Sequence, residues 1–363
     1  MRKKMIALTA VLFLALIFTP RCFAVGEQIA RETRAFELDR ALPDGTRENL
    51  EQSEISADNV NTDGIGDYIV SCIKSAGQKP MECGAKMIGL MLLSVLVLGV
   101  GESIKDRKIA DVLGMVCGCA CMLCLFEPLC RLAQSASEAV GAASTFSLAF
   151  TPVYGALLIL AGKPATAAVF GGRAAAAGAF FTFLTKSVVV PACSVLLGFS
   201  VLSCAGIGVG GDKVAQSISK AVKWLMGICA VLFAGIISLN SAVAAGTDSL
   251  ALRTAKFVIS GSVPVIGSAL GDAVSAVSGS VSAIKSGVGA FGIIAFAYIF
   301  IPVISQNIMW SAVIGFCSFA AEMLGLDNLK KTFSAAGAVS GMLLACELFS
   351  LTVIVISAGA VLS

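Results

Sequence analysis

The sequence predicts an all-α, polytopic membrane protein, and three observations carry that prediction. Of the 363 residues, 57% are apolar and 13% are charged, about half the charged fraction that is usual in a soluble domain. The apolar residues gather in long uncharged runs, and roughly 20 such residues cross the hydrocarbon core of a bilayer as a helix. The N-terminus combines a basic cluster with an apolar run, as an export signal does.

A cleaved signal peptide is expected over residues 1–24. Three basic residues at positions 2–4 form the positive n-region, Met5–Thr19 is the apolar h-region, and Cys22–Ala24 supplies small residues for a cleavage site. The h-region is short for a spanning helix, so an uncleaved signal anchor is the less favoured alternative. In both cases we expect the segment that follows to lie outside the cytoplasm.

Residues 25–85 are expected to form a polar extracytoplasmic segment. They hold 12 acidic and 6 basic residues, a net charge of −6, whereas residues 86–363 hold 11 acidic and 16 basic residues, a net charge of +5. Two short amphipathic helices are predicted near Glu27–Leu42 and Gly66–Ala76, with a turn at Pro43–Gly45. Their few apolar residues cannot fill an independent core. We therefore expect this segment to lie on the membrane surface or against a partner.

Residues 86–363 are expected to form a helical membrane domain with about eight spanning helices. One uncharged run, Ser286–Ala321, is too long for one helix, and Pro302 with Ser305–Asn307 suits a tight turn between two spans. The remaining spans are Met87–Gly101, Val112–Phe126, Ala139–Gly162, Ser187–Gly211, Trp224–Thr247 and Thr332–Ser363.

Two further segments do not fit a simple span. Pro164–Thr185 is rich in Ala and Gly but contains Arg173, so it is either an interfacial helix or part of a kinked span. Phe257–Ile284 contains Pro264, several Gly and Ser, and Asp272. We expect it to form a membrane-embedded or interfacial helical hairpin. Irregular backbone persists at that depth only where protein or water covers it.

The distribution of Lys and Arg sets the expected orientation, because cytoplasmic connections carry an excess of both. With eight spans and residues 25–85 outside, the inner connections hold eleven basic residues and the outer ones hold four, namely Arg131, Lys213, Lys220 and Lys223. The three outer lysines are the weak point of this topology. They would mark an inside loop if one span were miscounted.

One carboxylate lies in the middle of an apolar run. Glu347 interrupts the stretch Thr332–Ser363, and a carboxylate buried in a membrane is costly unless it is paired or hydrated. Two interpretations stand. Glu347 either forms an ion pair with Arg173 or Lys186 of a neighbouring helix, or lines a polar pathway.

Small residues recur at every fourth position of the hairpin segment, namely Gly267, Gly271, Ser275, Gly279, Ala283 and Gly287. On a helix this spacing makes a groove into which another backbone packs closely. Helix packing is the favoured interpretation of this small-residue ridge. A hydrated, pore-facing surface is the alternative.

The motifs do not point to an enzyme. The chain has no histidine, which excludes Ser-His-Asp catalysis and HExxH zinc sites. Gly206–Gly211 matches GxGxxG but ends an apolar helical run rather than a strand, as a dinucleotide site would require. The cysteines crowded into residues 117–130 are interpreted as small core residues, because a single helix does not wrap four ligands around one metal. We expect no catalytic residues, no cofactor and no metal.

Two cysteines of the outer segment, Cys72 and Cys83, would form a disulfide in an oxidising compartment. The scattered basic residues of the rest do not predict a nucleic-acid surface.

A block of residues between positions 253 and 292 is more specific than any of these motifs. It reads Arg253–Ser260, Val263–Gly267, Leu270–Ala273, Gly279, Ile284–Lys285 and Val288–Gly292. In this order it resembles the stage III sporulation protein AE family, membrane proteins of endospore-forming bacteria. The resemblance marks Arg253, Lys256, Pro264, Gly267, Asp272, Gly279, Lys285 and Gly289 as positions to mutate and implies no catalytic role for them.

The resemblance implies a role rather than a reaction. Members are subunits of a channel-like complex that joins the mother cell to the forespore during engulfment and supports late forespore development. The implied partners are other stage III sporulation membrane proteins, an associated ATPase, ring-forming proteins of the intermembrane space and the lipid bilayer, with no nucleic acid. The implied location is the mother-cell membrane that surrounds the forespore.

The alternative function is a stand-alone secondary transporter for a small solute. A transporter predicts an internal repeat with paired broken helices. The sequence offers one Gly-, Pro- and Ser-rich hairpin, at 253–292, and no repeat partner for it. The complex subunit is therefore the favoured prediction.

Overall fold

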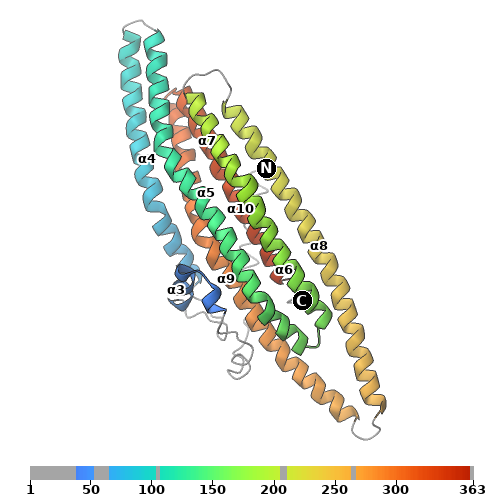
Figure 1. Ribbon diagram of the computed structural model, residues 1–363. Helices are drawn as coiled ribbons and strands as arrows, with labels where there is room; N and C mark the ends of the chain where they lie inside the picture. The colour runs from blue at the N-terminus through green and yellow to red at the C-terminus, as the bar shows by residue number, and fades with distance from the viewer. Residues whose placement is uncertain (1–37, 53–64, 104–106, 205–210, 263–266, 360–363) are drawn as a thin grey trace.

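The structure, a computed structural model, describes residues 38–52, 65–103, 107–204, 211–262 and 267–359. Within these ranges the chain is helical, and its long helices run antiparallel to their neighbours in an elongated bundle (Figure 1). In chain order the helices are α3 (Asp44–Gln52), α4 (Ile65–Ser103), α5 (Arg107–Leu160), α6 (Pro164–Leu184), α7 (Val190–Cys204), α8 (Gly211–Ser262), α9 (Gly267–Met323) and α10 (Asp327–Gly359). The signal peptide expected at 1–24 lies outside the described residues.

Six helices of the described chain are long and apolar enough to cross a membrane. The expected count of eight spans is not confirmed, because the stretches Val112–Phe126 and Ala139–Gly162 both lie in the continuous helix α5. The predicted turn within Ser286–Ala321 is wrong, because α9 continues through Pro302. A proline inside a membrane helix is tolerated where neighbouring groups satisfy the freed backbone.

The N-terminal part of the described chain also differs from the sequence prediction. Pro43–Gly45 does not form an isolated turn, since the carbonyl of Pro43 accepts hydrogen bonds of 2.9 Å from the backbone N–H groups of Thr46 and Arg47 and thereby starts α3. Gly66–Ala76 is not a separate short helix but the beginning of α4. The expected boundary at residue 85 therefore falls inside a continuous helix.

The segment Pro164–Thr185 belongs to a kinked span, one of its two predicted alternatives. Helix α6 continues into α7 through a π-helical turn at Thr185–Val189, where the N–H of Val190 bonds to the carbonyl of Thr185. Pro191 is the second residue after this turn. Because proline has no N–H and clashes with the carbonyl four residues before it, a local widening of the helix relieves the conflict.

Two short connections between helices have the same backbone geometry. Gly162 (φ 75°) follows α5 and Gly325 (φ 70°) follows α9. After each glycine, the next N–H bonds to the carbonyl five residues earlier, from Lys163 to Leu158 and from Leu326 to Ala321. This is the Schellman ending of a helix, in which glycine takes the left-handed position without a Cβ penalty. The C-terminal ends of α4, α7 and α9 and the N-terminal ends of α5, α8 and α10 lie at one end of the bundle (Figure 1). The C-terminal ends of α5 and α8 and the N-terminal ends of α6 and α9 lie at the other end.

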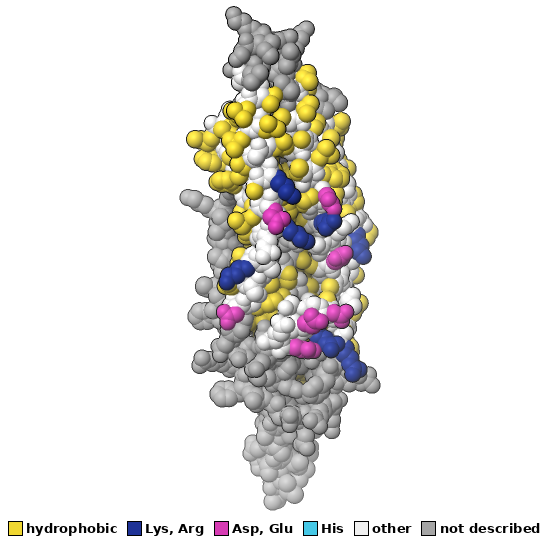
Figure 2. Space-filling model, turned by 90° about the vertical axis from the view of Figure 1, so that its left-hand side faces the viewer, with side chains coloured by type: hydrophobic (Ala, Val, Ile, Leu, Met, Phe, Trp, Pro, Cys, Tyr) yellow, Lys and Arg dark blue, Asp and Glu magenta, His cyan; other side chains and the backbone are white. Residues whose placement is uncertain are grey.

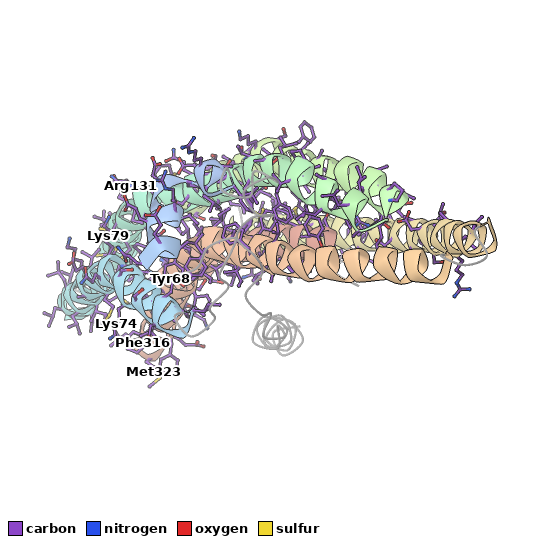
Figure 3. The ribbon with its side chains drawn as sticks, turned by 90° about the horizontal axis from the view of Figure 1, so that it is seen from below. Tyr68, Lys74, Lys79, Arg131, Phe316 and Met323 are labelled. Atoms are coloured by element: carbon purple, nitrogen blue, oxygen red, sulfur yellow. The ribbon has the colours of Figure 1, made fainter. Side chains whose placement is uncertain are left out.

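One face of the bundle carries most of the described surface charge. Figure 2 shows charged side chains across the middle of the α4–α5 face, below an apolar region. Figure 3 places Lys74, Lys79 and Arg131 on this side of the molecule. We call this surface the polar belt, defined by the exposed residues Lys74, Lys79, Glu82, Lys86, Glu127, Arg131 and Glu138.

Contacts between helices show which part of α8 lies at the same level along the bundle as the polar belt. A β-carbon on Gly84 of α4 would lie 2.7 Å from Val313 of α9. Near that level, Ser311 of α9 and Ser340 of α10 share a 2.7 Å hydrogen bond, and Ser219 of α8 donates one of 2.8 Å to Ala338 of α10.

The charged half of α4, before residue 87, therefore lies at the level of the apolar run of α8, after residue 223. There, after Lys220 and Lys223, α8 exposes large apolar side chains, among them Trp224 (70%), Val231 (72%) and Leu232 (60%). From residue 224 onward, α8 therefore presents an apolar surface at a depth where the α4–α5 side is charged.

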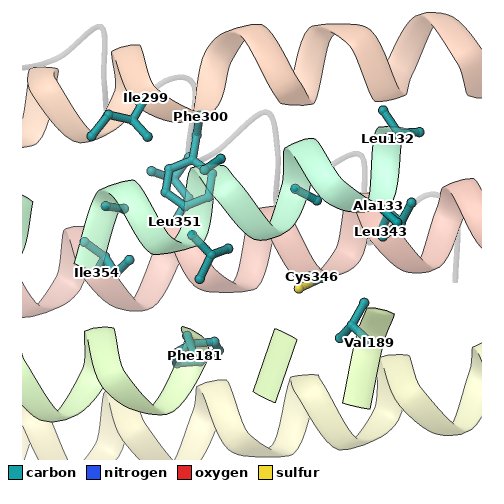
Figure 4. Packing of buried hydrophobic residues seen from close by; sticks show 14 of the residues in the cluster. Leu132, Ala133, Phe181, Val189, Ile299, Phe300, Leu343, Cys346, Leu351 and Ile354 are labelled. Atoms are coloured by element: carbon teal, nitrogen blue, oxygen red, sulfur yellow. The ribbon is translucent and has the colours of Figure 1, made fainter. Parts of the chain in front are cut away.

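Helix α10 is the central element of the core. Figure 4 shows Leu343, Cys346, Leu351 and Ile354 of α10 between residues of α5 and α9 on one side and of α6 and the π turn on the other. All four side chains are buried. From Thr332 to Ala358, α10 has no exposed side chain, and a helix buried on all sides is stable only when other helices surround it.

Aromatic rings fill the half of the bundle nearer the α5–α6 connection. Phe150 of α5 stacks on Tyr154 with 5.2 Å between ring centroids, and Phe146 packs edge-on against Phe296 of α9 at 5.1 Å. A β-carbon on Gly292 of α9 would lie 2.5 Å from the Phe150 ring. The absence of a side chain at Gly292 is what lets α5 and α9 approach closely here.

Candidate functional site

A chain of buried polar side chains crosses the interface between α9 and α10. The amide nitrogen of Asn307 donates a 3.1 Å hydrogen bond to Oε1 of Glu347. The carbonyl oxygen of Asn307 accepts a 2.6 Å hydrogen bond from the hydroxyl of Ser340, which also shares one of 2.7 Å with the hydroxyl of Ser311. Hydrogen bonds between side chains of neighbouring helices stabilise helix association in an apolar environment.

The helical period explains why these four residues meet. Asn307 and Ser311 are four residues apart and share one face of α9, and Ser340 and Glu347 are seven residues apart on one face of α10. Asn307 was expected in a turn between two spans, but it is helical, and its amide is fully buried against α10. The sequence reasoning therefore missed Asn307 as a residue that links two helices by hydrogen bonds.

Glu347 is fully buried, and its second oxygen, Oε2, has no hydrogen-bond partner within the described chain. The ion pair considered for Glu347 is not present. Its hydrogen-bond partner is Asn307, Lys186 is exposed to the surroundings, and Arg173 bonds to the hydroxyl of Ser241 of α8 instead. A buried carboxyl group with a free oxygen can bind or release a proton, or accept a hydrogen bond from water.

The structure does not bring the small-residue ridge to this network. Gly267, Gly271, Asp272, Ser275, Gly279 and Lys285 lie in the first part of α9, which is one continuous helix with the rest. Gly289, further along, is buried. The 18 residues between Gly289 and Asn307 correspond to about 27 Å along the helix. The ridge and Glu347 are therefore separate features of one long helix.

The remaining hairpin residues lie at the end of α8 or beyond it. Arg253 is exposed near that end, Lys256 follows one turn later, and Pro264 lies outside the described residues. The expected hairpin is thus the junction of two long helices, α8 and α9, rather than a short insertion in the membrane domain (Figure 1).

Asp248 of α8 is a second polar residue that the sequence reasoning missed. Its carboxylate accepts hydrogen bonds of 2.9 Å from the backbone N–H groups of Ala165 and Thr166, and one of 2.5 Å from the Thr166 hydroxyl. These groups form the first turn of α6, so Asp248 caps that helix from a neighbouring one. Pro164 at the first helical position was the available sequence signal for a helix start here.

The cysteines are free thiols in the described chain. Cys72 and Cys83 both lie on α4, and their 11-residue separation corresponds to about 16 Å along the helix, beyond the reach of a disulfide. The disulfide considered for this pair is therefore not present. Cys121 is fully buried in the core, whereas Cys124 is exposed.

Comparison with known proteins gives a family. The family model for stage III sporulation protein AE matches residues 47–363. A relative from Bacillus subtilis (strain 168), described as stage III sporulation protein AE, is 28% identical over 158 residues. That alignment covers 44% of this chain and 40% of the relative. No solved structure matches. Because the family model covers most of the chain, including the polar network and the small-residue ridge, the chain belongs to the stage III sporulation protein AE family.

Proposed function

We propose that this protein is a membrane subunit of a transenvelope channel or secretion-like complex that links mother cell and forespore and is needed for late forespore development. Family membership supports a role in sporulation. The observation that carries the complex is the placement of the polar belt. It lies at the depth where α8, on the other side of the bundle, exposes apolar side chains. Charged side chains at that depth are stable only where protein or water covers them.

The proposed topology follows from the ends of the bundle. We propose that the leader is cleaved and that the N-terminal segment lies outside the cytoplasm, which puts the α4–α5, α7–α8 and α9–α10 connections inside. Among the described residues, that end carries Arg107, Lys108, Lys213, Lys330 and Lys331, and the opposite end carries Lys163, Arg253 and Lys256. The positive-inside rule favours this orientation. With six spans Lys213, one of the three lysines that the eight-span topology placed outside, lies on the cytoplasmic side.

The proposed subunit has a non-enzymatic role. Its partners would be other stage III sporulation membrane proteins, an associated ATPase that supplies the energy, and ring-forming proteins of the intermembrane space. The protein would lie in the mother-cell membrane around the forespore. In this arrangement α8 faces lipid and the polar belt faces partner chains or a hydrated path.

The test is a mild-detergent pull-down of the tagged full-length protein from sporulating cells at engulfment, with mass spectrometry of what is recovered. We expect an ATPase and intermembrane ring proteins, and we expect the double variant Lys74→Glu/Lys79→Glu to lose them. The matched control is Val231→Ala/Val243→Ala, which alters the exposed face of α8 and should retain the partners. Recovery of a lone homo-oligomer, together with abundance in growing cells, would contradict the complex and favour a stand-alone secondary transporter.

A further inference from the structure

A second buried polar group lies in the bundle apart from the Glu347 network. Arg173 of α6 is 93% buried, since its relative exposure is 7%. Its Nη1 donates to the hydroxyl of Ser241 of α8, while its Nε and Nη2 have no hydrogen-bond partner within the described chain. The ion pairs of the described residues do not include Arg173. The nearest carboxylate along α8, Asp248, uses both oxygens to cap α6.

A third unpartnered polar group lies on the neighbouring helix α5 and packs against the same aromatic ring as Arg173. The hydroxyl of Tyr154 of α5 is fully buried without a hydrogen-bond partner in the described chain. Tyr154 and Arg173 both pack against the ring of Phe170, at 5.2 Å between ring centroids for Tyr154 and 5.8 Å from the Arg173 Cζ. Arg173 and Tyr154 therefore share one apolar, aromatic-walled environment between α5, α6 and α8.

The free atoms of Arg173 have a specific geometry. The Nε–H and one N–H of Nη2 point to the same side of the planar guanidinium and form a fork that matches two oxygens of a carboxylate or phosphate. The other edge of the guanidinium is occupied by Ser241. A buried cation is costly without a counter-charge. The free Nε and Nη2 of Arg173 can only donate, and the Tyr154 hydroxyl can donate as well. The missing partner is therefore an acceptor that carries negative charge.

We propose that Arg173 and Tyr154 form a binding site for an oxoanion, a carboxylate or phosphate group, between α5, α6 and α8. The fork of Arg173 binds two oxygens side by side, and the Tyr154 hydroxyl donates to one of them. The ring of Phe170 forms one wall of the site. The oxoanion belongs either to a free solute or to the headgroup of an anionic lipid. This site is independent of the proposed partners.

The test uses the purified full-length protein in a neutral maltoside detergent that contains no phosphate. The melting temperature is measured during titration with sodium acetate, sodium phosphate or sodium chloride at constant ionic strength, and binding of acetate and phosphate is then measured by calorimetry. We expect saturable stabilisation by acetate or phosphate but not by chloride. Added phosphatidylglycerol that abolishes the effect of the free anion assigns the site to a lipid headgroup, and no such competition assigns it to a soluble anion.

The variants separate this site from a general salt effect. Tyr154→Phe removes one hydrogen bond to a charged group and should weaken binding about 10- to 100-fold. Arg173→Lys keeps the charge but loses the fork and should weaken binding as well, while Arg173→Gln should abolish it. The matched control Lys186→Gln removes an exposed charge downstream in the same kinked span and should bind like wild type. Equal effects of all three anions, or unchanged binding by Tyr154→Phe and Arg173→Lys, would overturn the proposal.

Discussion

Asn307 connects Glu347 to Ser340, donating a 3.1 Å hydrogen bond to the carboxyl group and accepting one of 2.6 Å from the hydroxyl. This arrangement satisfies both ends of a buried amide and one oxygen of a buried carboxyl group. The other oxygen, Oε2, stays without a partner in the described chain. The network therefore stabilises the contact between α9 and α10 and leaves one protonatable atom free.

The substitution Glu347→Gln separates these two roles. Glutamine keeps an oxygen that can accept the bond from Asn307, so we expect protein abundance and melting temperature close to wild type. It removes the ionisable group, and we expect heat-resistant spores to fall by about tenfold or more if the carboxyl group lines a polar path. Spore counts and immunoblots of the same cultures measure both effects. Normal sporulation would remove Glu347 from the functional site and leave it a structural residue.

The close approach of Phe150 to Gly292 predicts that a side chain added at position 292 lowers stability. Gly292→Ala places a methyl group 2.5 Å from the Phe150 ring, and such overpacking typically destabilises a core by about 1–3 kcal/mol. Thermal unfolding in detergent measures the loss. The matched control is Gly315→Ala in the same helix, where an added β-carbon meets nothing within 4 Å and alanine is the better helix former. A Gly292→Ala protein as stable as the Gly315→Ala protein would show that α5 and α9 do not pack this closely.

Because Asp248 caps α6, removing its carboxylate should destabilise the start of that helix. Asp248→Ala leaves the N–H groups of Ala165 and Thr166 without their acceptor, and loss of a cap costs about 0.5–2 kcal/mol. We expect a lower melting temperature and faster proteolysis near the α5–α6 connection. Ser249→Ala, next to it on α8 and exposed, should change neither. Equal proteolysis of the two variants would contradict the cap.

If the small-residue ridge packs against another helix, a large side chain placed on it should disrupt assembly. Gly279→Leu puts a bulky side chain on the small-residue ridge that the sequence spacing predicts, so it should disrupt assembly or sporulation while the protein still inserts in the membrane. Membrane fractionation, pull-down and spore counts distinguish these steps. Gly315→Leu, at an exposed position in the same helix, serves as the control for side-chain size. A Gly279→Leu strain that assembles and sporulates normally would leave the ridge without a role in packing.

The sequence by itself determined the class of the protein. Long uncharged runs are costly in water, so they specify membrane helices whatever their neighbours are. The order of residues between 253 and 292 indicates the family, because a family resemblance depends on residue types and their spacing and not on their contacts. The isolation of Glu347 in an apolar run likewise marked a position that needs a polar partner.

Only the tertiary structure decided how the runs are divided and what the polar residues contact. Whether Pro302 ends a helix depends on groups from neighbouring helices, and here α9 continues and Asn307 reaches α10. The pairing of Glu347 with Asn307, the capping of α6 by Asp248 and the bond from Arg173 to Ser241 all join residues at least 40 positions apart. Such contacts follow from the depth and rotation of each helix in the bundle, which packing sets and local sequence does not specify.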